Sequence, residues 1–486
     1  MTSLSSFDVL ADLRRDSLHK TGTVINQRLG KKMKVFNTLT GQKEDFIPRG
    51  EVVTMYVCGI TAYDDSHIGH AMTYIIFDII KRYLGFKGYK VKHVQNFTDI
   101  DDKIIERANQ FGMPPLELAN KYADQYFANM DALNIERADL YPRATEEIPK
   151  VIEIIQGLLA KDYAYESDGS VYFRVRNLSD YGKLSHRGLA ETIPRASDYE
   201  EKKEYPLDFA LWKASKPSEP FWKSPWGNGR PGWHIECSAM ALKYLGDSID
   251  IHGGGQDLIF PHHENEIAQS ESFTSVVPFT RYWLHNGLMQ QDKQKMSKSI
   301  GNLVSVKDLL NHFSPDAIRL FILSSHYRNP LTYSEQALEA NERGAERLRW
   351  ALTHRANAGK GAAMLDAKPF EQKFVEAMDD DFNTAQAIAG LFELAKEINR
   401  GVEQGADITQ AQDTLLNLAG ILGLTLKEKT QPTTEAETCI SFLVSTRDDL
   451  RQNQQWQLAD KIRNGLADLG ITLEDTPQGT RWKYKR

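Results

Sequence analysis

The feature that most constrains the fold is a strand–turn–helix pattern in residues 52–84. An apolar β-type run, Val52–Val57, ends at the pair Cys58-Gly59. A helix then begins near His70, with apolar residues spaced three to four apart. The free N–H groups and the dipole of a helix N-terminus form a phosphate-binding site. Because the turn has neither a G-x-G-x-x-G nor a P-loop sequence, it implies neither dinucleotide binding nor a Walker-type NTPase.

Composition narrows the protein class without giving a function. The chain has 486 residues, 41% hydrophobic and 26% charged, as in ordinary globular proteins. Its net charge of −7 argues against a protein that coats nucleic acid by electrostatics alone, although residues 481–486 form a basic end. No apolar run reaches the roughly 18 residues of a membrane span. The chain has only three cysteines, Cys58, Cys237 and Cys439, so a disulfide framework is not expected. The expected location is therefore the reducing cytoplasm.

The order of the remaining elements predicts an α/β protein built on a Rossmann-type parallel sheet. Residues 89–95 alternate like a second strand, and a β-α pattern returns near residues 232–266. Between them, residues 165–225 change to short strands and loops rich in proline and tryptophan, which indicates an insertion that splits the sheet domain. Helical periodicity follows at about 334–356, 369–402 and 408–423, and a polar linker precedes a small final domain.

Two short motifs far apart in the chain give the first functional signal. One is His67-Ile68-Gly69-His70, and the other is Lys295-Met296-Ser297-Lys298-Ser299, here called the lysine loop. Each is weak alone, since lysine runs are usually solvated surface. In this order, histidines at a helix start and paired lysines in a later loop resemble the signature of class I aminoacyl-tRNA synthetases.

A second constellation indicates a metal site. With three cysteines, the chain has too few for an all-cysteine zinc site, so zinc must recruit histidine or carboxylate ligands. His262 and Glu266 are four residues apart and would share one helix face. Cys58 and Cys237 fall at strand or turn ends, where a parallel sheet gathers ligands. A lone buried cysteine is usually a small hydrophobe, but this combination favours zinc.

Several longer segments resemble cysteinyl-tRNA synthetases. They are Tyr56–Gly59, Asn96–Lys103, Asp208–Lys213, Arg230–Met240, Asp250–Glu266 and the lysine loop. The resemblance runs from about residue 33 to the C-terminus. It implies a ligase that activates cysteine with ATP and transfers it to the 3′ end of tRNA(Cys), acting as a cytoplasmic monomer. ATP, L-cysteine and tRNA(Cys) are the partners it implies, and no membrane is involved.

The resemblance also implies which residues bind the amino acid and its metal. The implied zinc ligands are Cys58, Cys237, His262 and Glu266. Thr98 and Trp233 match positions that line the amino-acid pocket. His252 could be another pocket residue, but a structural histidine at a strand end explains it nearly as well.

Further residues match the nucleotide and anticodon sites of the family. Those for ATP and its Mg²⁺ are His67, Gly69, His70, Gly255, Asp257, Lys295 and Lys298. The two histidines would stabilise the α-phosphate and the two lysines would hold the β- and γ-phosphates, so these four are the expected catalytic residues. Implied anticodon readers are Arg451, Trp456 and Asp460, although Trp456 could instead anchor a small core.

A zinc ion gives a chemical reason for specificity. Cysteine and serine differ only by sulfur for oxygen, and apolar packing separates such close isosteres weakly. Zinc binds a thiolate far better than an alcohol, so no editing domain is required. Four protein ligands plus substrate would make zinc five-coordinate, and Glu266 is the candidate for the weak ligand.

With the resemblance, each part of the chain receives an expected role. Residues 1–32 are an N-terminal extension of unknown role. The other expected parts are the first half of the catalytic domain (33–150), a connective insertion (151–225), the second half (226–290), a lysine-loop and stem-contact region (291–333), a helical bundle (334–426) and an anticodon-binding domain (437–486).

Three other functions compete with this interpretation. A paralogue could activate cysteine on the same core and pass it to a small amine, but such ligases lack the anticodon-binding end. A silent tRNA-binding relative would have no need of intact histidine and lysine motifs. An unrelated nucleotidyltransferase would share the histidine chemistry but would leave the zinc constellation without explanation.

Overall fold

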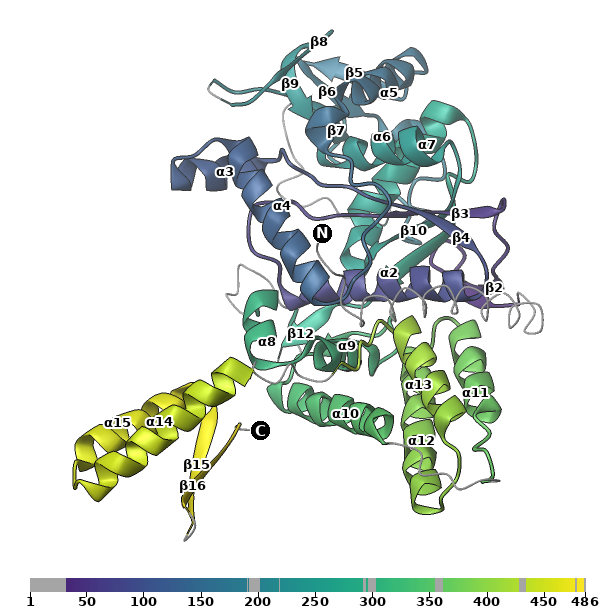
Figure 1. Cartoon of the computed structure of the whole chain (residues 1–486). Helices are drawn as coiled ribbons and strands as arrows, with labels where there is room; N and C mark the ends of the chain where they lie inside the picture. Colours follow the sequence, from purple (N-terminus) through teal and green to yellow (C-terminus); the bar gives the residue numbers. More distant parts are fainter. Residues whose placement is uncertain are drawn as a thin grey trace, which may run out of the picture. The chain divides into compact units, whose positions relative to one another are not determined.

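The computed structural model describes residues 32–189, 191, 202–217, 219–291, 294–295, 303–354, 362–427, 434–476 and 479–484 (Figure 1). The chain divides into two units, Met1–Leu426 and Lys427–Arg486. Each unit has its own buried apolar core. The N-terminal extension predicted at 1–32 lies outside the described residues except for Lys32.

The first unit is organised around a four-stranded parallel sheet. Its strand order is β11-β10-β3-β4, and every neighbouring pair is parallel. The strands are β3 (Val52–Val57), β4 (Lys90–Gln95), β10 (Ile249–Gly255) and β11 (Thr280–Asn286). Because the carboxyl ends of parallel strands share one edge, the residues after β3 and β10 meet there. The predicted Rossmann-type α/β fold is confirmed.

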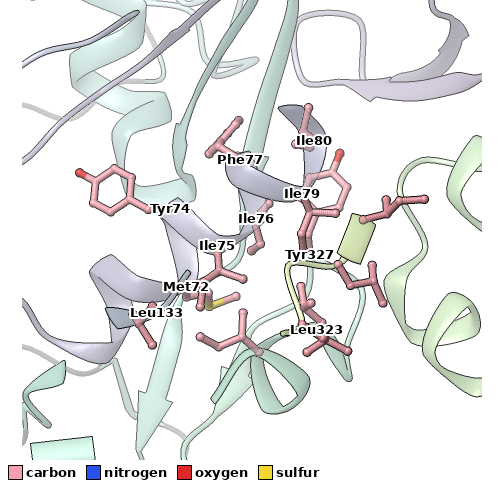
Figure 2. Packing of buried hydrophobic residues seen from close by; sticks show 14 of the residues in the cluster. Met72, Tyr74, Ile75, Ile76, Phe77, Ile79, Ile80, Leu133, Leu323 and Tyr327 are labelled. Atoms are coloured by element: carbon pink, nitrogen blue, oxygen red, sulfur yellow. The ribbon is translucent and has the colours of Figure 1, made fainter. Parts of the chain in front are cut away.

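Helices α2 (Ile68–Phe86) and α6 (Trp233–Leu245) pack on the strands of this sheet. The other helices of this part of the chain are α3 (Asp102–Phe111), α4 (Pro115–Ala132), α5 (Ile148–Ala160) and α7 (Glu264–Thr274). Helix α2 begins two residues earlier than predicted, because the side chain of His67, not of His70, caps it. Figure 2 shows Ile79 and Ile80 of α2 near Leu323 and Tyr327, with which they line one small gap, whereas Tyr74 and Phe77 of α2 point elsewhere.

A five-stranded antiparallel sheet, of order β5-β6-β7-β9-β8, interrupts the parallel sheet in the chain. It comprises β5 (Ala164–Ser167), β6 (Ser170–Phe173), β7 (Phe209–Ala214), β8 (Trp222–Ser224) and β9 (Gly227–Pro231). Smaller pieces are β1 (Lys34–Asn37), β2 (Gln42–Asp45), β12 (Met289–Gln291), β13 (Gln294–Lys295), β14 (Leu331–Thr332), η1 (Ala144–Glu146), η2 (Val175–Asn177), η4 (Gln256–Leu258) and η5 (Ile259–His263).

The rest of the first unit is helical. Its helices are α8 (Val306–His312), α9 (Pro315–Leu323), α10 (Glu335–Thr353), α11 (Lys368–Asp379), α12 (Thr384–Glu403) and α13 (Thr409–Ile421). The single helix predicted over 369–402 is wrong, because the chain turns between α11 and α12. Asp381 and Phe382 adopt left-handed backbone angles there, with φ of 61° and 51°. The buried carboxylate of Asp381 accepts hydrogen bonds from Phe36 N and the Tyr327 hydroxyl, which offset that strain.

The second unit contains two helices and a hairpin. These are α14 (Thr434–Gln452), α15 (Trp456–Asp468), β15 (Ile471–Thr476) and β16 (Gly479–Tyr484). Its core consists of Ile440, Val444, Leu466, Ile471 and Leu473. None of the described helices in either unit combines the length and apolarity needed to span a bilayer.

Candidate active site and metal cluster

Two histidines lie at the N-terminus of α2, and their hydrogen bonds determine which ring nitrogen carries the proton. His67 Nδ1 accepts from the backbone N–H groups of Gly69 (3.1 Å) and His70 (3.4 Å). In return, His70 Nδ1 accepts from His67 N at 3.4 Å, and the rings stack at 3.7 Å. A ring nitrogen that accepts carries no proton, so a neutral ring keeps its proton on Nε2. Burial, reinforced by His67, holds the pKa of His70 well below its usual value, so His70 stays neutral.

A cleft of about 790 Å³ opens at this helix end. Of the residues predicted to bind ATP or cysteine, it is lined by His67, Gly69, His70, Gly255, Asp257 and Trp233. Cys58 lines the same cleft. The cleft therefore joins the end of β3, the start of α2 and the end of β10, as the parallel topology requires.

Thr98 and His252, also predicted for the amino-acid pocket, lie deeper than the residues that line the cleft. The buried Thr98 hydroxyl donates to Glu236 Oε2 at 3.0 Å. His252 is fully buried, its ring stacks on Trp283 at 4.4 Å, and its Nε2 lies 3.6 Å from Cys58 Sγ. It adjoins the cysteine cluster while packing like a core residue, so both interpretations made from sequence stay open.

A buried cluster of sulfur, nitrogen and carboxylate donors lies beside the cleft. One ligand atom each from Cys58, His262, His263 and Glu266 falls within 4.8 Å of the others. Cys58 Sγ is 3.6 Å from Glu266 Oε1 and 3.9 Å from Cys237 Sγ. His262 Nε2 is 3.1 Å from Glu266 Oε1. All four predicted zinc ligands are thus neighbours in space.

The cluster fits a zinc-type ion on two grounds. Thiolate, imidazole and carboxylate are the donor set that zinc takes in proteins. Within the described part of the chain, Glu266 Oε2 is buried without a hydrogen-bond partner, which is costly unless something else binds it. The hydrogen bond from Cys58 lowers the pKa of Cys237 to about 6 against the effect of burial. The thiolate is therefore favoured at Cys237, whereas burial raises the pKa of both Cys58 and Glu266.

Sequence reasoning missed two histidines that extend the cluster. His263 Nε2 lies 3.2 Å from Cys58 Sγ, and His263 Nδ1 lies 2.8 Å from His285 Nε2. His285 Nδ1 in turn lies 2.8 Å from the Thr38 hydroxyl. The His262-His263 pair was a signal for one of them, because the π-helical turn η5 buries both rings. His285 had no local signal, since β11 brings it there from a distance.

The lysine loop lies largely outside the described residues. Lys295 ends β13, and the side chains of Lys295 and Lys298 belong to the part that is left undescribed. Two backbone hydrogen bonds join the chain after the loop to the segment that begins α2. Ile68 N donates to Val304 O at 2.9 Å, and Val306 N donates to Ser66 O at 2.9 Å. These two bonds, here called the backbone strip, join the segment after the lysine loop to the start of α2.

In the second unit, the predicted anticodon readers lie on its two helices. Arg451 is in the last turn of α14, while Trp456 is the first residue of α15 and Asp460 lies one turn further. Trp456 is 55% exposed, so its ring does not anchor the small core of this unit.

Two family models and many curated proteins match this chain. The model described as the class I (C) tRNA synthetase catalytic domain matches residues 46–343. A DALR domain model matches residues 373–427, which span the second half of the predicted helical bundle and one residue beyond it. A cysteine–tRNA ligase of Dehalococcoides mccartyi (strain 195) is 57% identical over 457 residues, covering 93% of this chain and 100% of the relative. The cysteine–tRNA ligase of Geobacillus thermodenitrificans is 50% identical, covering 93% of this chain and 99% of the relative.

The chain belongs to the cysteine–tRNA ligase family. The resemblance inferred from its motifs is thereby confirmed. Solved structures of other synthetases share the fold of this cysteine–tRNA ligase family member. Methionyl-tRNA synthetase of Mycobacterium tuberculosis with methionyl-adenylate matches with a TM-score of 0.57 at 17% identity, covering 77% of this chain and 90% of that one. A ternary LeuRS–tRNA complex of Agrobacterium radiobacter matches with a TM-score of 0.56 at 12% identity, covering 78% and 84%.

Proposed function

We propose that this chain is a cysteine–tRNA ligase. It activates cysteine with ATP, giving cysteinyl-adenylate and pyrophosphate, and then transfers cysteine to the 3′ end of tRNA(Cys). One observation carries the proposal: Cys58 of the donor cluster lines the same cleft as His67 and His70. The site proposed to select the thiol and the site proposed to bind phosphate therefore open into the same cleft.

The first step is attack of the cysteine carboxylate on the ATP α-phosphate. His67 and His70, with protons on Nε2, stabilise the charge that develops there. Lys295 and Lys298 hold the β- and γ-phosphates, and Mg²⁺ accompanies ATP. Gly255 lets Asp257 approach the backbone closely, since a Cβ at Gly255 would lie 2.6 Å from Asp257 Oδ1.

Cysteine binds beside Trp233 and above Thr98 and His252. We assign a zinc ion to Cys58, Cys237, His262 and Glu266, with Glu266 as the weakest ligand. Zinc supplies a position that prefers a thiolate to the hydroxyl of serine. All four side chains are buried, and of the four Cys58 alone lines the cleft, so the protein limits the approach of water to that side.

In the second step, the terminal ribose hydroxyl of tRNA(Cys) attacks the mixed anhydride. We assign recognition of the anticodon to the second unit, where the exposed ring of Trp456 suits stacking on an unpaired base. Arg451 and Asp460 would bond base edges. We expect the ligase to act as a monomer in the cytoplasm.

The deciding experiment is ATP-dependent charging of unfractionated tRNA with labelled cysteine, run beside serine. Cysteine attached to a single tRNA species, with no serine attached, would support the proposal. Adenylate formation without charging would favour the small-amine ligase and remove the role given to Trp456.

The zinc assignment has its own test. Cys237→Ser replaces a thiolate ligand with a poor one, so bound zinc and cysteine-dependent pyrophosphate exchange should fall together. Metal analysis of the purified protein and the exchange rate are the measurements. Normal exchange after this change would show that the zinc assignment is wrong.

A further inference from the structure

Helix α2 is joined to the chain after the lysine loop at a second place besides the backbone strip. Asp78, farther along α2, forms a fully buried ion pair with Arg319 of α9, Nη2 to Oδ2 at 2.5 Å. Helix α9 follows α8, and α8 begins at Val306 in the backbone strip. The strip and the ion pair therefore restrain the same stretch of chain against α2.

The bonds of Arg319 fix its geometry. Besides Asp78, its guanidinium donates from Nε to Leu422 O at 2.9 Å and from Nη1 to Leu133 O at 3.1 Å. The chain passes so close that a Cβ on Gly423 would lie 2.1 Å from Arg319 Nη2, and Gly423 has a φ of 68°. Because the planar guanidinium of Arg319 is hydrogen-bonded on several sides, it can move little relative to its partners.

Asp78 is restrained from its own side as well. It accepts from Arg82 Nε at 3.0 Å and from Glu136 N at 2.9 Å. Buried ion pairs contribute little net stability compared with apolar packing, but they can specify one arrangement of the elements they join. Here the elements are α2 and α9.

Apolar packing between α2 and the end of α9, where Ile322 and Leu323 lie, is tight enough to transmit a displacement. Figure 2 shows Ile79 and Ile80 of α2 gathered near Leu323 and Tyr327. The gap that these residues line has a volume of only about 10 Å³. A close-packed contact of this kind cannot absorb a shift of one helix without moving the other.

We propose that Arg319 is a positioning residue for the ATP-dependent step. Through Asp78 it holds α2, and with it His67 and His70, in register with the segment that follows the lysine loop. The inference rests on the proposed function, because it assigns the two motifs to one ATP molecule. The cysteine site is built mainly on β3, α6 and α7, so its affinity should not depend on Arg319.

The experiment compares two substitutions at one position in the full-length protein. Arg319→Met removes the whole donor fork and keeps apolar bulk. Arg319→Lys gives up the fork but keeps a cation for Asp78. The matched control is Asp250→Asn, since the buried Asp250 carboxylate accepts from Arg49 N and Thr54 N and contacts neither α2 nor α9 in its hydrogen bonds.

The readouts are thermal unfolding, the kinetics of pyrophosphate exchange, and hydrogen exchange at the amides of Ile68 and Val306. Arg319→Met should lower kcat/KM for ATP roughly 10- to 100-fold, as small misplacements of reacting groups do, with KM for cysteine unchanged. Arg319→Lys keeps a cation for Asp78 but loses the bonds to Leu422 O and Leu133 O, so its loss of kcat/KM should be smaller than that of the Met variant. The two amides should exchange fastest in the Met variant.

Three results would overturn the inference. The first is a loss in the Met variant no larger than in Asp250→Asn at a similar unfolding temperature. The second is an equal rise in KM for cysteine. The third is unchanged exchange at the two amides. If the wild-type protein shows no cysteine-dependent exchange, the proposed function fails, and the amide measurement still decides whether Arg319 holds α2 in place.

Discussion

At the scale of single residues, His93 shows how burial sets a charge. It lies in β4, and among the described residues neither of its ring nitrogens has a hydrogen-bond partner. Burial, with a smaller effect of Lys81, lowers the pKa of His93 from 6.5 to about 3. The native state needs the neutral ring, whereas the unfolded chain takes up a proton below pH 6.5. The stability from His93 is therefore present above pH 6.5 and lost as the pH falls toward 3.

The substitution His93→Gln removes this titration. Below about pH 6, the wild-type free energy of unfolding should fall more steeply than that of the variant, by about 1.4 kcal/mol per pH unit. Paired melting curves at about pH 7.5 and about pH 5 measure the difference in slope. His312→Gln serves as the control, because His312 is exposed at the end of α8. Equal slopes for wild type and His93→Gln would contradict the expectation.

The residues of the candidate site were predictable where spacing within one element carried the information. His262 and Glu266 are one helical turn apart in sequence, and their side chains do lie together. The place of His285 depends on the register of β11 against β10, which only the tertiary structure provides. For the same reason, the contact between Thr98 and Glu236 had no signal in the sequence.

At the scale of elements, the packing of α2 on β10 depends on one glycine. A Cβ on Gly253 would lie 2.1 Å from the ring of Phe77. Gly253 O also accepts from Cys58 N at 3.0 Å, so the strand cannot retreat without disturbing the cluster. The bare backbone at this position lets the helix and the strand approach closely.

The change Gly253→Ala should therefore destabilise the first unit by about 1–3 kcal/mol through overpacking. Phe77→Leu makes room for the new methyl group, so the double variant should be more stable than Gly253→Ala alone. Thermal unfolding of the three proteins tests this coupling. Simple additivity of the two single changes would show that the close contact is not what limits this position.

Periodicity predicted the presence of these elements better than their ends. The parallel strands and the amphipathic face of α2 follow from local patterns. The break between α11 and α12 could not be predicted, because the left-handed turn at Asp381 is held by partners in β1 and near Tyr327. The start of α9 has a local signal, because the Ser314 side chain caps the helix and Pro315 is its first residue.

At the scale of the whole molecule, the two units have separate cores. A protein ending at Leu426 should therefore keep cysteine-dependent pyrophosphate exchange and lose charging of tRNA. The exchange rate and the charging rate, measured on the same preparation, test this expectation. If the truncated protein charged tRNA at the rate of the full-length protein, the second unit would have no role in anticodon recognition.

The strand order also bears on how the protein folds as it is synthesised. Met55 of β3 pairs directly with Ile251 of β10, and the whole antiparallel insertion lies between them in the chain. Contacts so distant in sequence form late and slowly, while hairpins of neighbouring strands form early. The nascent chain thus carries an open β3 edge until β10 emerges from the ribosome, and such edges invite aggregation. Cys58 is synthesised long before Cys237, His262 and Glu266, so the proposed zinc site can be completed only late in the synthesis of each chain.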